Sequence, residues 1–172
     1  MARCPSRPDR GGDQRNHARD HRQGIGSLIV TIEREVVIGR AAAAIFAALT
    51  NFGPGSPWYT QVAEAQVEPS GPVGLGSRIT QVHIDGARRE ETRYLVDRFQ
   101  LDRALCLRSV GVKPASTIDY QLNEDASRTR LSCSIQVQTG GLLRLVESRL
   151  RRDLDRKLEK TLDQFKETME RP

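Results

Sequence analysis

The sequence predicts an α+β domain in which seven antiparallel strands curve around one long C-terminal helix. From residue 62 to residue 139, six segments carry apolar side chains at every second position, and short turns rich in Gly, Pro, Asn and Asp separate them. This pattern is typical of an antiparallel sheet with one wet face. From residue 142 to about residue 171 the apolar side chains recur every three or four positions, which is the period of an amphipathic helix.

The first 26 residues predict a disordered basic tail. Apart from Met1 and Ile25 they hold no aliphatic side chain larger than Ala, so they cannot bury enough apolar surface to offset the entropy of ordering. Residues 1–27 hold six Arg and three Asp, which leaves the rest of the chain almost balanced in charge. We assign residues 27–172 to one domain, and the tail is either a functional extension or a misassigned start.

The domain opens with a strand over residues 28–38, where Leu, Val and Ile alternate with Thr and Glu. Residues 41–50 consist mostly of strong helix formers and predict a first short helix. The following NFGPGSP segment contains two Gly and two Pro, so we expect the second short helix there to be distorted.

The six later strands are predicted from alternation and from the turns between them. Their short connections favour pairing between strands that are neighbours in the sequence, as in a meander. The predicted strands span residues 62–68, 77–84, 88–99, 104–110, 117–122 and 130–139.

The C-terminal helix is long for so small a domain. About 30 residues at ~1.5 Å each give ~45 Å, whereas a compact domain of this length has a radius of gyration of only ~15 Å. The helix must therefore cross the whole domain. Its apolar positions, repeated in steps of four, rotate by ~40° per step, so a flat surface cannot cover them but a twisted, concave sheet can.

Four local patterns resemble the polyketide cyclase/dehydrase and START-like superfamily, whose architecture is called the helix-grip fold. They are VTIEREVVIGRAAAAIFAALTNFGPGSPWYTQV with Trp58, EPSGPVGLGSRITQVH with Gly74, Gly76 and Ser77, SRTRLSCSIQV with Thr129 and Leu131, and LDRKLEKTLDQFKETME. The resemblance spans roughly residues 28–170. It implies a cavity between the sheet and the C-terminal helix that holds a lipid, polyketide or similar apolar molecule, in relatives that are carriers or enzymes.

Aromatic and apolar side chains with inward phase are the candidates for lining such a cavity. Tyr120 is in phase with Ile118 and Leu122, and Cys133 is in phase with Leu131. The alternative is that these side chains only fill the core. The full candidate set is Trp58, Tyr59, Tyr94, Tyr120, Cys133, Ile135, Val146, Leu150 and Leu154.

No catalytic residue is identified. His83 is the only histidine outside the tail, but Val82 and Ile84 flank it, so alternation predicts that His83 faces solvent. The Gly74-Leu75-Gly76 turn lacks the third glycine of a dinucleotide fingerprint and precedes a strand. The cysteines and histidines lack metal-ligand spacing, so we expect neither metal nor cofactor.

We therefore expect a binding protein for a small hydrophobic or aromatic ligand. The first alternative is an enzyme that resembles polyketide cyclases, aromatases or dehydrases, and the second is a non-catalytic protein-interaction module. The balanced charge argues against nucleic-acid binding, and no apolar run approaches the ~20 residues of a membrane span. A soluble, cytoplasmic, bacterial monomer or homodimer is expected.

Overall fold

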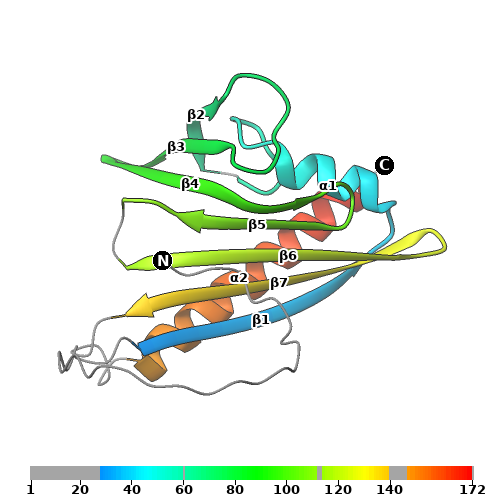
Figure 1. Cartoon of the computed structure of the whole chain (residues 1–172). Helices are drawn as coiled ribbons and strands as arrows, with labels where there is room; N and C mark the ends of the chain where they lie inside the picture. The colour runs from blue at the N-terminus through cyan, green and yellow to red at the C-terminus, as the bar shows by residue number, and fades with distance from the viewer. Residues whose placement is uncertain (1–27, 60, 112–113, 140–146, 172) are drawn as a thin grey trace, which may run out of the picture.

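The computed structural model describes residues 28–59, 61–111, 114–139 and 147–171, and it shows seven strands and a long C-terminal helix (Figure 1). The predicted basic tail and the predicted helical residues 142–146 lie outside the described residues. The predicted strand order is confirmed, and the strand ends shift by at most three residues. The elements are β1 (Leu28–Ile38), α1 (Ala42–Thr50), β2 (Val62–Glu68), β3 (Arg78–Asp85), β4 (Arg88–Gln100), β5 (Ala104–Ser109), β6 (Ala115–Asp125), β7 (Arg128–Thr139) and α2 (Glu147–Glu170).

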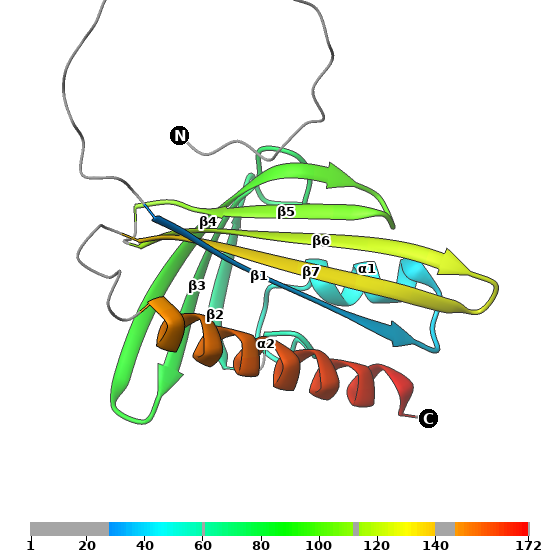
Figure 2. The ribbon, with the colours of Figure 1, turned by 90° about the horizontal axis from the view of Figure 1, so that it is seen from below.

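The strands form one antiparallel sheet in the order β1-β7-β6-β5-β4-β3-β2. Neighbours in the sheet are neighbours in the sequence except for β1, which pairs with β7 from Leu28↔Thr139 to Ile38↔Thr129. The register shifts in β2 between Val62 and Glu64 and in β4 near Val96, and such bulges increase strand bending and twist. Figure 2 shows β2 and β3 running at a steep angle to β1 and β7, so the sheet curls around α2.

One short helix, α1, follows β1 within the described residues, and the expectation of a second short helix is wrong for residues 51–59. These residues form bends and turns. Gly55 adopts a φ of 79°, in the left-handed region. The Ser56 hydroxyl accepts hydrogen bonds from the backbone N–H groups of Trp58 and Tyr59, each at 3.2 Å. These local bonds satisfy backbone donors without a helix.

The core lies between the concave face of the sheet and the C-terminal half of α2. Leu105, Leu107 and Leu131 on the sheet have no measurable exposure, and Leu158, Leu162 and Phe165 on α2 are at most 3% exposed. The end of α2 is tied to the turn after β1, because the Gly39 N–H donates to Glu170 Oε1 at 2.7 Å and the Arg40 guanidinium donates to the carbonyl of Met169 at 2.6 Å. In the described ranges no helix is long and apolar enough to cross a membrane.

Replacing Phe165 with Ala should destabilise the protein by about 3–5 kcal/mol, because the substitution leaves a cavity at a fully buried position between α2 and the sheet. Urea unfolding measures the effect. The matched control, exposed Glu167→Ala on the same helix, should change the free energy of unfolding by less than about 0.5 kcal/mol. A loss at Phe165 no larger than that of the control would show that α2 is not held as described.

Candidate ligand-binding site

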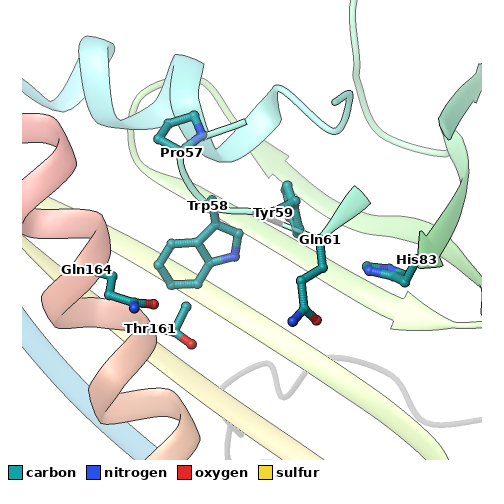
Figure 3. A pocket seen from close by; sticks show the side chains of 7 residues that line it. All are labelled: Pro57, Trp58, Tyr59, Gln61, His83, Thr161 and Gln164. Carbon is teal, nitrogen blue, oxygen red and sulfur yellow. The ribbon is translucent and has the colours of Figure 1, made fainter. Parts of the chain in front are cut away.

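A hollow of about 210 Å³ opens between the segment after α1, strand β3 and helix α2 (Figure 3). We call it the Trp58 hollow. One wall is apolar and formed by Pro57, Trp58 and Tyr59. The remaining lining side chains are polar, uncharged at neutral pH and drawn from three separate elements: Gln61, His83, Thr161 and Gln164. An apolar wall with a few convergent polar groups is the usual composition of a small-molecule site.

Trp58 connects the hollow to the protein core. Its indole Nε1–H donates a hydrogen bond to the Tyr120 hydroxyl at 2.9 Å, and both groups are buried. The indole also meets the rings of Tyr120 and Phe165 edge-on, with centroids 5.4 and 4.9 Å away. Trp58 therefore joins the loop, the sheet and α2, and its outer edge forms the wall of the hollow.

The rest of the loop is held by buried polar contacts. Gln81 is 1% exposed and its Nε2 donates to the Phe52 carbonyl oxygen at 2.9 Å. The rings of Phe52 and Tyr59 pack with centroids 5.2 Å apart. The Ile84 N–H reaches the Gln61 carbonyl at 3.4 Å. Loop residues on the rim of the hollow are thus anchored to β3 on two sides.

His83 faces the hollow, which corrects the prediction that it faces solvent. It is in phase with Ile79 and Gln81, both buried on the concave face, whereas Ile84 is 48% exposed on the other face. The prediction took the apolar Val82 and Ile84 to mark the inward face, but Val82 is buried on the convex face. On the convex face its cross-strand neighbours are Glu64 and Glu91, and long side chains of this kind cover apolar neighbours with their methylene groups.

The environment of His83 favours the neutral imidazole. Partial burial lowers the pKa of His83 from its ordinary value of 6.5, and the nearby Glu90 carboxylate opposes this shift only in part. His83 Nε2 lies 3.0 Å from Thr92 Oγ1. A neutral imidazole has one nitrogen that donates and one that accepts, so His83 can exchange a hydrogen bond or a proton with a bound molecule.

The other predicted lining residues divide into two groups. Tyr120 and Cys133 are paired across β6 and β7 and fully buried beneath Trp58; burial raises the pKa of both groups, which keeps the phenol and the thiol protonated. The second group does not line the Trp58 hollow and is partly exposed to solvent: Tyr94, Ile135, Leu150 and Leu154. Val146 lies outside the described residues. That this whole set lines a ligand cavity stays a prediction.

Four lining residues were not expected from the sequence: Pro57, Gln61, Thr161 and Gln164. Thr161 and Gln164 lie three residues apart at the border of the apolar stripe of α2, and this border position is the only signal that pointed to them. For Gln61 the sequence holds no such signal. Across the described ranges, no three His, Cys, Asp or Glu side chains come together as a metal site would require.

The sequence and the fold are both similar to those of known proteins. The sequence profile described as "Polyketide cyclase / dehydrase and lipid transport" matches residues 30–170. No curated protein matches the sequence. A solved protein of unknown function from Staphylococcus aureus is similar, with a TM-score of 0.72 and 11% identity over 86% of this chain and 97% of that one.

Two further solved structures share the fold. The di-domain ARO/CYC StfQ from the steffimycin biosynthetic pathway has a TM-score of 0.67 and 13% identity, over 83% of this chain and 51% of StfQ. Truncated norcoclaurine synthase from Thalictrum flavum has a TM-score of 0.64 and 10% identity, over 87% of this chain and 99% of that one. At such low identity these similarities show the fold alone.

The lowered pKa of His83 predicts a pH dependence of stability. Because the unfolded state binds the proton more readily, the stabilisation by neutral His83 is present above pH 6.5 and is lost as the pH falls through the lower folded-state pKa. NMR titration should place the midpoint of His83 below the ordinary histidine value of 6.5. The variant His83→Gln should lose this part of the pH dependence, and an unshifted His83 midpoint would refute the described burial.

Proposed function

Because the chain belongs to the polyketide cyclase / dehydrase and lipid transport family, we propose that it binds a small, largely apolar ligand between the sheet and α2. The Trp58 hollow is the observation that carries this proposal. Its volume of about 210 Å³ exceeds the roughly 150 Å³ of an apolar cavity that accepts benzene. A single aromatic ring, or one end of a longer molecule, therefore fits beside the indole.

The polar rim favours an uncharged ligand with hydroxyl or carbonyl groups. Gln61 and Gln164 each offer an amide that donates and accepts, and neutral His83 offers the ring nitrogen that does not contact Thr92, as a donor or an acceptor according to its tautomer. The Thr161 hydroxyl donates to the Lys157 carbonyl at 2.8 Å, so it faces a ligand as an acceptor. No Lys or Arg is among the described lining residues, so a carboxylate would gain no ion pair there.

The concave surface offers a continuation for a longer ligand. Tyr94 is cross-strand partner of the buried Ile79, and Ile135 is partner of Ile118 and Ile32. These side chains keep partial exposure while packing against the core. An apolar body that starts at Trp58 would extend along this surface toward Leu154, which supports ligands such as aromatic polyketides.

Filling the Trp58 hollow should weaken ligand binding. Thermal-shift measurements with aromatic polyketides, quinones and fatty acids should raise the melting temperature most for the uncharged aromatic compounds, since a ligand at 100 times its Kd adds about 2.7 kcal/mol of stability. Thr161→Phe places a ring in the hollow and should weaken binding at least tenfold. The control Thr168→Phe alters an exposed threonine about two turns further along α2, outside the hollow, that makes the same hydroxyl-to-carbonyl bond. No shift with any compound class would refute the proposal.

A cyclase- or dehydrase-like activity is the second candidate, and the position of neutral His83 in the hollow favours it. In the loss of water from a β-hydroxy carbonyl compound, His83 would take the proton next to the carbonyl. The carbon–oxygen bond then breaks, and the imidazolium returns the proton to the departing hydroxide. Such general acid–base assistance contributes about 10²–10⁴-fold to a rate.

If the protein catalyses this step, His83→Gln should lower kcat by about 10²–10⁴-fold while changing the Kd of a non-reacting analogue by less than about threefold, because Gln keeps a hydrogen-bonding group there. Turnover of a β-hydroxy ketone, followed by absorbance of the conjugated product, measures the effect. Tyr94→Phe and Tyr120→Phe test the two phenols in the same assay. Undiminished turnover in His83→Gln would exclude the histidine mechanism, and ligand binding would remain to be judged by the thermal-shift experiment.

A further inference from the structure

A second and larger hollow lies on the other side of the Phe52–Tyr59 ring pair. Its volume is about 570 Å³, within the range of roughly 300–1,000 Å³ of small-molecule pockets. Figure 1 shows its main elements at one end of the sheet, where α1 lies beside the β4–β5 turn. We call it the α1 hollow. Phe52 lines the α1 hollow and Tyr59 lines the Trp58 hollow, with ring centroids 5.2 Å apart.

The walls of the α1 hollow are mostly apolar, with Thr50 and Asn51 as uncharged polar exceptions, and contacts within the core hold them in place. Phe46 on α1 meets Phe99 on β4 edge-on, with ring centroids 5.3 Å apart. The first turn of α1 is held by Glu124, whose Oε2 accepts the Ala42 N–H at 3.0 Å. Ala43 and Ala47 lie one helical turn apart on the exposed side of α1 and line the hollow with methyl groups only. The small alanine side chains therefore leave space beside the aromatic rings that line the same hollow.

The charge at the rim gives this hollow a preference for positively charged ligands. Asp102 is the only ionisable side chain among the described lining residues, and no basic residue lines the hollow. Within the described ranges the Asp102 carboxylate has no hydrogen-bond or ion-pair partner. It is half-buried at the β4–β5 turn, where its φ of 58° is left-handed. A half-buried carboxylate without a partner beside an apolar wall favours a cation.

We propose that the α1 hollow is a second ligand site, distinct from the Trp58 hollow, that takes a small apolar amine. The hydrocarbon or aromatic body contacts Phe46, Phe52 and Phe99, and the protonated nitrogen sits at the Asp102 carboxylate. Anions such as fatty acids are repelled from this rim. Leu101, 69% exposed next to Asp102, adds apolar contact at the entrance.

Three naphthalene probes of the same shape and different charge test the proposal: 2-naphthylmethylamine, 2-naphthylmethanol and 2-naphthoate. Titration with each probe, followed by NMR shifts of the Ala43, Ala47 and Leu101 resonances, gives the Kd at this location, and Leu101 remains as the reporter in every variant. We expect the protonated amine to bind about tenfold more tightly than the alcohol, and the carboxylate to bind most weakly. The preference for the amine should decrease with added salt.

Asp102→Asn removes the charge and keeps the turn, because Asn tolerates a left-handed backbone. In this variant the Kd values of the amine and the alcohol should be equal, and the Kd of the alcohol should stay within twofold of its value in the unaltered protein. The double variant Ala43→Leu and Ala47→Leu fills the hollow from the exposed side of α1 and should weaken all three probes at least tenfold.

The Trp58-hollow variant Thr161→Phe is the control for location, and it should leave these affinities unchanged. Equal affinity for the three charge forms, or an amine preference that survives Asp102→Asn, would overturn the proposal. Loss of probe binding in Thr161→Phe but not in the double variant Ala43→Leu and Ala47→Leu would also overturn it, and would assign the probes to the Trp58 hollow instead. Failure of the ligand proposal for the Trp58 hollow leaves these outcomes unaffected.

Discussion

The hydrogen bond between the Trp58 indole and the Tyr120 hydroxyl is the interaction on which the site depends. An indole N–H without a partner in an apolar core would cost about 1–3 kcal/mol, so the Tyr120 hydroxyl fixes where the indole can lie. The Phe165 ring on α2 also packs edge-on with the Trp58 indole. One side chain from an irregular loop thereby sets the distance between the sheet and α2 and forms the boundary between solid core and open hollow.

This boundary explains why the hollow beside α2 is small and open to solvent, where the resemblance implies a cavity between the sheet and the C-terminal helix. Trp58, Tyr120 and Phe165 fill the space under the C-terminal half of α2. The polar side chains that remain exposed on the concave face, His83 above all, are then confined to the rim. The solved structures with this fold include norcoclaurine synthase and the ARO/CYC StfQ, so the fold alone does not identify a function. The side chains at the rim must do so.

The two hollows differ in the chemistry that they offer. The Trp58 hollow presents hydrogen-bonding groups that are neutral at pH 7, so it suits a ligand with hydroxyl or carbonyl oxygens. The α1 hollow presents mostly hydrocarbon surface, with Asp102 as its one carboxylate and Thr50 and Asn51 as its uncharged polar side chains. Phe52 and Tyr59 separate them, and both belong to a segment that Ser56 and Gln81 hold by hydrogen bonds. A rigid partition of this kind permits two ligand preferences within one small domain.

The sequence by itself determined the seven strands, the meander of the last six, the long helix and the inward positions of Tyr120 and Cys133. The meander follows from short connections and the rest from periodicity, and both depend on residues close together in the chain. The pairing of β1 with β7 joins the two ends of the domain, and only the tertiary structure shows it. The sequence did not determine the turns at residues 51–59, because hydrogen bonds to Ser56 replace helical ones there, nor the face of His83, because cross-strand neighbours bury Val82 as well. In the sequence, Thr161 and Gln61 cannot be told apart from the polar residues of an ordinary surface. Only the bulged sheet and the crossing of α2 bring them to one rim, since Gln61 and Thr161 are 100 residues apart in the chain.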